Sequence, residues 1–344
     1  MVHVGLTHPQ DLRAWQRWQD SRHPARSVLT RVRPRPARGV LTRGGEAPDV
    51  LVALDSGSPS NRAALLAPVA HLPRERVAVL APPGLAPTSA GWRSAPWSAD
   101  TLDRSLDSVR LVVSAGHYLP LGGAGFALAT SRDVPFVVVQ HGLLTPHAPP
   151  LPPSARLLAW SEADVEFWCA GRDDVRSAVV GAQLLWEATA AAGGDDDVPR
   201  TPAGPPTYLG QLHGAELPRP VLAAAAEAFC RETGASYRPH PSERDRASRR
   251  QHARWEAAGI VVERDGPPLA ELGTPVVSVF STGVLEAAAR GLPAWVELPD
   301  PPPWLAEFWA RYGMRRWGED PTPAPPLPAT APAQLVARAI EGLL

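Results

Sequence analysis

Four short segments place side chains that can bind phosphate or move a proton directly after apolar runs of β-strand composition. The first, residues 136–147, reads FVVVQHGLLTPH, so that four apolar residues lead toward His141 and Gly142. Imidazole, with an unperturbed pKa of about 6.5, is well suited to take a proton from a hydroxyl group near neutral pH. We therefore predict that His141 is a general base and that Gly142 allows the turn beside it. The alternative is a histidine that only caps that turn.

The second segment, SYRPHPSER at residues 236–244, carries Arg238 and His240 on either side of a proline. Side chains two residues apart on an extended chain point to the same side, and the flanking prolines stiffen that geometry. The planar guanidinium fork matches phosphate oxygens. We predict that the two side chains clamp a diphosphate. The alternative is a structural arginine–carboxylate pair beside a surface histidine.

The third segment, VVSVFSTGVLEAAARGLP at residues 276–293, predicts a strand that leads into Ser281, Thr282 and Gly283 and then into a helix. The free N–H groups at a helix start, assisted by two hydroxyls, form an anion site. Glu286 follows one turn later, where it could accept hydrogen bonds from sugar hydroxyls. The alternative is an ordinary helix cap with a surface glutamate.

The fourth segment, TYLGQLHGAE at residues 207–216, predicts a strand followed by Gln211 and His213. His213 could contact phosphate or an acceptor, and a structural role is an equal alternative. In SAGHY, His117 also follows a predicted strand and ranks below His141 as a candidate base. These residues are the secondary candidates for the site.

The composition excludes several other chemistries. All 34 cationic side chains are arginines, which excludes Schiff-base and P-loop lysines. The two cysteines, Cys169 and Cys230, lie far apart in apolar, helix-like stretches, so neither a disulfide framework nor a cysteine-based zinc site is expected. The acidic run at 195–197 has the character of a solvated cluster, and no metal-ligating or dinucleotide-binding spacing occurs. We expect no metal and no cofactor.

The charge balance and the apolar runs indicate the compartment. The 344 residues carry a net charge of −1, so no basic field indicates nucleic acid as a partner. The N-terminus lacks a basic segment followed by a long apolar run, and no stretch approaches the length of a membrane span. We expect a cytoplasmic protein; the sequence does not predict its oligomeric state.

Short β-branched runs alternate with helical patterns along the chain, which predicts parallel sheets with helices on both faces. The strands expected in the first half are residues 2–6, 50–54, 77–80, 111–114, 136–139 and 157–159, with helices at 61–71, 123–132 and 162–170. The strands expected in the second half are residues 207–209, 236–238, 260–263, 276–280 and 294–297, with helices at 219–232, 246–258 and 283–290.

A composition shift divides these elements into two domains. Residues 187–206 are rich in Gly, Pro and Asp, as in a solvated linker. We therefore predict an acceptor-side Rossmann-like domain at 1–186 and a nucleotide-donor-binding Rossmann-like domain at 207–332. A last amphipathic helix is expected at 333–344.

The order and spacing of these motifs resemble the GT-B superfamily, and most of all the CDP-glycerol glycerophosphotransferases and bacterial capsule-polysaccharide glycosyltransferases. The resemblance covers roughly residues 105–300. One departure is Gln140, which stands where the glycerophosphotransferases carry an aromatic residue. The matching residues are His141, Gly142, the Arg238–Pro241 segment, Ser281, Thr282, Glu286, Ala287, Gly291 and Pro293.

The resemblance implies two doubly wound, Rossmann-like domains facing across a cleft. It also implies transfer of a sugar or a polyol phosphate from a nucleotide-activated donor to a hydroxyl acceptor, without a metal, in polysaccharide biosynthesis. His141 would then be the general base or an acceptor-side residue. A nucleotide-sugar epimerase of the same fold, or a GT-B protein that binds a nucleotide or a partner without turnover, remain alternatives.

The same resemblance assigns the remaining candidates to the donor. Arg238 and His240 would bind the donor phosphates. Ser281 and Thr282 would cap the diphosphate, and Glu286 would hold the nucleotide ribose.

Overall fold

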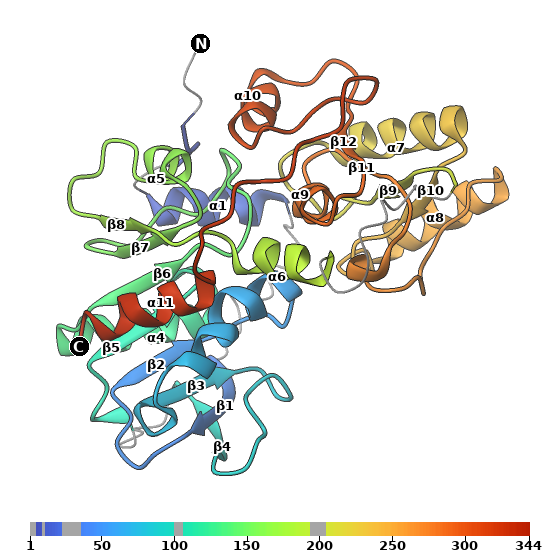
Figure 1. Cartoon of the computed structure of the whole chain (residues 1–344). Helices are drawn as coiled ribbons and strands as arrows, with labels where there is room; N and C mark the ends of the chain where they lie inside the picture. Colours follow the sequence, from blue (N-terminus) through green and yellow to red (C-terminus); the bar gives the residue numbers. More distant parts are fainter. Residues whose placement is uncertain (1–4, 9–10, 23–35, 100–105, 193–203) are drawn as a thin grey trace. The chain divides into compact units, whose positions relative to one another are not determined.

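The computed structural model describes residues 5–8, 11–22, 36–99, 106–192 and 204–344. The chain folds into two compact units (Figure 1). The first consists of residues 1–184 and 328–344, and the second of residues 185–327. In the described ranges, no helix has the length and apolar character needed to cross a bilayer.

The first unit is built on an eight-stranded sheet of order β4-β1-β3-β2-β5-β6-β7-β8. The strands from β3 to β8 in this order are parallel, and β1 pairs antiparallel with both β3 and β4. Their bounds are β1 (Arg38–Arg43), β2 (Val50–Ala53), β3 (Val77–Ala81), β4 (Arg93–Ser98), β5 (Leu111–Ser114), β6 (Phe136–Val139), β7 (Arg156–Ala159) and β8 (Arg176–Val179).

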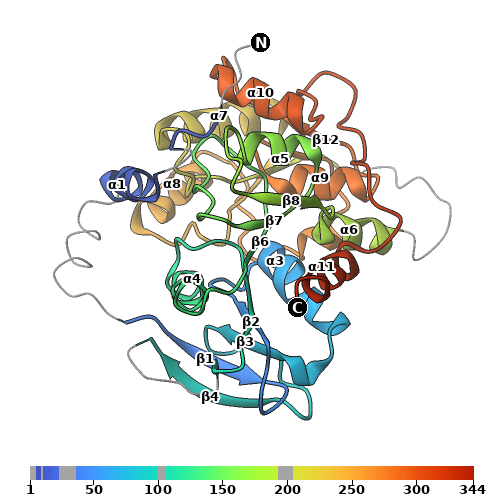
Figure 2. The same cartoon turned by 90° about the vertical axis from the view of Figure 1, so that its left-hand side faces the viewer.

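Helices cover both faces of this sheet, which explains why its central strands β2, β3 and β6 are apolar at every position. Figure 2 shows α4 and α11 on opposite sides of the strands. One core cluster joins Leu51, Val112 and Val138 to Leu121 and Phe167, and the other joins Val52, Val113 and Val139 to Leu65 and Val336. The helical segments are α1 (Leu12–Arg22), α3 (Pro59–Asn61), η1 (Arg62–Leu66), η2 (Ala67–His71), η3 (Arg74–Arg76), α4 (Pro120–Arg132), α5 (Glu162–Trp168) and α11 (Pro332–Glu341).

The second unit has a four-stranded parallel sheet of order β10-β9-β11-β12. Isolated parallel bridges at Val262 and Arg316 extend it at its two ends. The strands are β9 (Thr207–Leu209), β10 (Ser236–Arg238), β11 (Val276–Ser278) and β12 (Ala294–Val296). The helical segments are α7 (Arg219–Thr233), α8 (Arg246–Ala257), η5 (Leu269–Glu271), α9 (Thr282–Ala289) and α10 (Pro303–Arg311).

The second sheet is also covered on both faces. Tyr208 of β9 lies 5.5 Å from the ring of Phe229 in α7. The next residue, Leu209, points to the other face because strand side chains alternate. There it packs so closely on α9 that a Cβ at Gly283 would lie 2.5 Å from its Cδ1. Both units are therefore doubly wound α/β structures, and the predicted fold class is confirmed.

The structure differs from the predicted elements in a few places. The helix expected at 61–71 is a series of short π and 3₁₀ turns, because Pro68 lacks the N–H that a continuous α-helix requires. The strand expected at 260–263 is only an isolated bridge at Val262. Residues 187–192, assigned to the linker by composition, form the end of α6 (Gln183–Ala192). Residues 2–4 of the first expected strand and residues 195–197 lie outside the described ranges.

Candidate functional site

Eight of the predicted site residues lie at or after the ends of adjacent parallel strands of the second sheet. Because β10, β9 and β11 are parallel neighbours, the loops after them meet at one edge of the sheet. Gly210 N–H donates to the carbonyl of Arg238 at 2.7 Å, which joins the first two loops. Phe280 N–H donates to Gln211 Oε1 at 2.8 Å, which joins the loop after β9 to the start of α9. The roles predicted for these residues stay a prediction.

Helix α9 begins at this edge with a neutral cap. Ser281 is the N-cap residue, and its hydroxyl oxygen accepts from Gly283 N–H at 3.1 Å. The hydroxyl hydrogen therefore stays available to an anion at the helix start. Gly283 owes its place to the close packing of α9 on Leu209, which leaves no room for a side chain.

Glu286 lies one turn into α9 and is largely enclosed. Burial raises the pKa of its carboxyl to about 7, against the opposing charge of Arg290. The guanidinium of Arg290 also donates to the carbonyl of Leu269 at 2.7 Å. A carboxyl that is partly protonated near neutral pH can donate a hydrogen bond as well as accept one.

Arg238 at the end of β10 has an unsatisfied guanidinium. Its Nη1 is buried without a hydrogen-bond partner, and the described residues contain no ion pair to this side chain. A Cβ at Gly266 would lie 3.4 Å from Nη1, so the loop after Val262 comes close to it. A buried guanidinium nitrogen without an internal acceptor is costly unless an anionic ligand supplies one.

His240 and His213 stack on each other, with ring centroids 3.7 Å apart and ring planes within 14°. Ser242 N–H donates to Nδ1 of His240 at 3.1 Å, so the neutral imidazole carries its hydrogen on Nε2. The packing around the ring and the charge of His213 lower the pKa of His240 to about 4, with Glu243 acting in the opposite direction. His240 keeps an exposed side, so water screens part of this effect.

Glu243 is a residue that the sequence reasoning missed. It lies in the same segment as Arg238 and His240, but its side chain is fully buried. Its carboxylate accepts from Leu212 N–H at 2.9 Å and from Nε2 of His252 at 2.9 Å. The polar residues on either side of it gave no signal of burial, and only its position three residues after His240 could have suggested a role.

In the first unit, His117 and His141 follow the parallel neighbours β5 and β6. Burial lowers the pKa of His141 to about 4, and burial together with the charge of Arg172 lowers the pKa of His117 to about 4. Nδ1 of each ring is buried without a hydrogen-bond partner. The ordinary imidazole pKa expected for His141 is therefore replaced by a lower one, and the ring is neutral throughout the neutral pH range.

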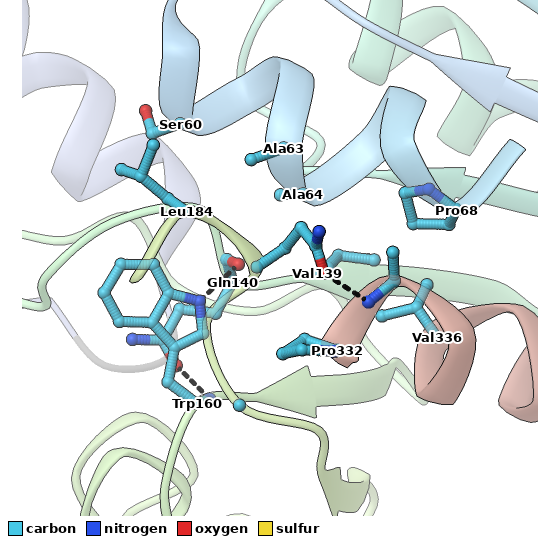
Figure 3. A pocket seen from close by; sticks show the side chains of 13 residues that line it. Ser60, Ala63, Ala64, Pro68, Val139, Gln140, Trp160, Leu184, Pro332 and Val336 are labelled. Atoms are coloured by element: carbon cyan, nitrogen blue, oxygen red, sulfur yellow. Dashed lines mark hydrogen bonds between the residues drawn. The ribbon is translucent and has the colours of Figure 1, made fainter. Parts of the chain in front are cut away.

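Gln140 holds the turn that carries His141. The Gln140 side chain accepts from Trp160 N–H at 2.9 Å and donates to the carbonyl of Gly142 at 3.0 Å. The indole N–H of Trp160 in turn donates to the Gln140 carbonyl at 2.9 Å, as Figure 3 shows. Gln140 thus has a local structural role.

A small pocket adjoins Gln140. Its lining includes Val139, Gln140 and Trp160 but not His141 (Figure 3). Further walls come from the helical turns between residues 60 and 68, from residues 181–184 and from α11. The pocket is mostly apolar and brings none of the titratable candidates together.

Comparison with known proteins identifies no family. No family model matches the chain, and no curated protein sequence does so either. The UDP-GlcNAc 2-epimerase from Methanocaldococcus jannaschii is similar over 85% of this chain and 99% of its own, at 11% identity and a TM-score of 0.42. A mutant O-GlcNAc transferase from Thermobaculum terrenum is similar over 99% of this chain and 69% of its own, at 16% identity and a TM-score of 0.42. The resemblance to CDP-glycerol glycerophosphotransferases stays a prediction.

Proposed function

We propose that the chain is a nucleotide-dependent transferase. In this proposal the second unit binds the diphosphate of an activated donor, and the first unit supplies a general base to a hydroxyl acceptor. The observation that carries it is the convergence of three anion-binding elements at one edge of the second sheet. These elements are the neutral-capped start of α9, the unpartnered guanidinium of Arg238 and the imidazole of His240.

Each element offers a donor to phosphate oxygens. The start of α9 supplies backbone N–H groups and the Ser281 hydroxyl. Arg238 supplies the only permanent positive charge of the three, and the neutral His240 supplies Nε2–H. Charge that develops on the leaving diphosphate would be stabilised by these preorganised donors.

His141 would accept the proton of the acceptor hydroxyl. With its pKa lowered to about 4, the ring carries a free lone pair at neutral pH. It is also a weaker base than an ordinary imidazole. Proton transfer would therefore come late, as the new bond to the acceptor oxygen forms and makes the proton more acidic.

A nucleotide panel tests the proposal. UDP, CDP, CMP and GDP are added to the protein, and the melting temperature and the heat of binding are measured. A ligand that binds only the folded state raises the melting temperature by mass action. If none of the four nucleotides binds at millimolar concentration, the proposal is wrong.

The corresponding activated donors distinguish the classes of activity. Release of nucleotide that depends on an added acceptor supports a transferase. Interconversion of the sugar without an acceptor identifies an epimerase instead. Binding without turnover of any donor identifies a protein that binds nucleotide and does not catalyse transfer.

A further inference from the structure

The second unit contains a buried carboxylate that stays ionised across the neutral pH range. Glu243 has a fully buried side chain that accepts from the Tyr237 hydroxyl at 2.9 and 3.2 Å, besides Leu212 N–H and His252 Nε2. Burial alone would raise the pKa of this carboxyl. The hydrogen bonds from Leu212, Tyr237 and His252, together with the nearby His213 ring, outweigh burial and lower the pKa to about 2.

The geometry disfavours simultaneous protonation of the two stacked rings beside this carboxylate. Two positive charges 3.7 Å apart repel each other, although both rings are exposed and water weakens that repulsion. Nδ1 of His213 is 4.0 Å from Oε1 of Glu243. Nδ1 of His240 is instead occupied by the N–H of Ser242. The two rings therefore have different surroundings although they touch.

We propose that His213 and His240 form a one-proton pair held by Glu243, in which His213 carries the proton and His240 stays neutral. Glu243 is then a positioning residue for the pair. The use of this proton on a phosphate group rests on the proposed function. The pair itself rests only on the geometry of the ligand-free protein.

Other charged groups surround the pair from the elements packed against it. Arg219 at the start of α7 donates to the Leu212 carbonyl at 3.2 Å and lies 3.6 Å from Asp245. Glu216 accepts from Ala215 N–H at 2.7 Å. Arg219 and Asp245 are an ion pair of opposite charge. Among the described residues, Glu243 is the carboxylate within 4.0 Å of a ring nitrogen of His213. Among the described residues, the titratable and charged groups around the pair include Glu216, Arg219, Tyr237, Arg238, Glu243, Asp245 and His252.

In a transfer reaction the pair would supply a proton to the leaving group. The bond from the transferred group to the leaving phosphate oxygen breaks, and its electron pair stays on that oxygen. The oxygen takes a proton from the pair, while the acceptor hydroxyl gives its proton to His141 as the new bond forms. Solvent then returns a proton to the pair and removes one from His141, so protons balance over the cycle.

Histidine titration by NMR, without ligand, tests the pair. In ¹⁵N-labelled wild-type protein the two rings should titrate in steps more than about one pH unit apart. Glu243→Gln keeps the shape and removes the charge, so the upper step should move down by about one unit or more. The matched control is Tyr237→Phe, which removes a different donor from the same carboxylate and should leave both steps in place.

A surface variant tests the pair without touching the buried network. In His213→Ala the neighbouring like charge is gone, so the titration of His240 should move upward. The proposal is overturned if both wild-type rings titrate together near pH 6.5, or if Glu243→Gln and Tyr237→Phe shift the steps equally. An unmoved His240 in His213→Ala would overturn it as well.

Binding of UDP then tests the use of the proton. When the pH is lowered from 8 to 5.5, the UDP dissociation constant should fall in both proteins. The fall should be about tenfold larger for the wild type than for Glu243→Gln, as expected for one added charge-assisted hydrogen bond. The titration of UDP itself is common to both proteins and cancels. If no nucleotide of the panel binds, the proposed function fails, and the NMR titration still decides the pair. If the UDP dissociation constant falls by the same factor in both proteins, the proposed role of Glu243 is wrong.

Discussion

Two helices of this chain, α4 and α9, begin directly after parallel strands, yet their N-termini are closed in different ways. At α4 the carboxylate of Asp55 accepts from Leu121 N–H at 2.7 Å and from Gly122 N–H at 2.8 Å. At α9 the cap is the uncharged hydroxyl of Ser281. The first helix start is already satisfied by an acidic group of the protein, and the second is free to bind an external one.

The difference shows how one architecture can provide two kinds of site. Asp55 follows β2 in the first sheet and occupies the place where a phosphate would approach α4. An anion near that helix would meet a carboxylate. In the proposed function, the first unit would accordingly serve proton transfer and a neutral acceptor, and the second would bind an anionic donor. The predictions below test this division from its largest expected effect to its smallest.

The largest effect is expected from His141→Ala. Loss of a general base should lower kcat by roughly 10²–10⁴-fold, while the donor dissociation constant should barely change because no donor contact is removed. The wild-type rate should rise with pH through about pH 4 and then stay level toward neutrality, because burial lowers the pKa of His141 to about 4. The measurements are a pH–rate profile and donor titration calorimetry.

A structural role for His141 predicts the opposite combination. The melting temperature of His141→Ala would fall, and the kcat of the folded fraction would stay near that of the wild type. A stable and fully active variant would exclude both roles and direct the search for the base to His117 or His213.

The next effect is expected from the double variant Ser281→Ala, Thr282→Ala. Loss of hydroxyl donors to phosphate should weaken nucleotide binding by roughly 10–100-fold. The fold should survive, because α9 keeps its buried face. Calorimetric titration with the best nucleotide of the panel measures the change. An unchanged dissociation constant would remove the α9 N-terminus from the site.

A smaller effect is expected from Arg238→Lys. The charge is kept but the bidentate fork is lost, so nucleotide affinity should fall by about tenfold. The matched control is Arg264→Lys, in an arginine that already pairs with Glu256. If Lys serves as well as Arg at position 238 while the control behaves like the wild type, the predicted clamp does not exist.

The sequence predicted the elements whose signals are local. Most inner strands of both sheets are short apolar runs, and the Ser281-Thr282-Gly283 helix start is contiguous in the chain. The inner strand β1 was missed because arginines begin and end it. The edge strands β4 and β8 were missed because they are largely exposed and carry polar residues, so they lack an apolar run. Base-like histidines were found by their position after strands, but their burial and the resulting pKa shifts depend on tertiary packing.

The partners of the candidate residues could not be predicted in the same way. Asp55 contacts a helix that begins 65 residues later, and Glu243 is satisfied by donors from β10, α8 and the loop after β9. Such contacts follow from the order of the strands in the sheet, which a single sequence does not specify. For this reason no sequence motif predicted that the Asp55 carboxylate binds the N-terminal N–H groups of α4 in the first unit.

The smallest effect is expected at the N-terminus of α4, where Asp55 accepts the two N–H groups. Asp55→Ala leaves two N–H groups of α4 without an acceptor and should cost about 1–2 kcal/mol of unfolding free energy, as for other lost caps. Asp55→Asn keeps a carbonyl acceptor and should cost less. Burial raises the pKa of Asp55 above its usual value of 3.8, against its two backbone donors. The folded state therefore holds the proton more tightly than the unfolded state, so this carboxyl stabilises most below pH 3.8 and loses that contribution as pH rises through its folded pKa. Urea unfolding should show that the free energy of unfolding of the wild type falls relative to that of Asp55→Asn between pH 3.5 and pH 7. If the wild type instead becomes more stable relative to Asp55→Asn over this range, the ionised carboxylate stabilises α4. The helix starts of α4 and α9 would then differ in the charge that stabilises them, and not only in whether a protein group already fills the site.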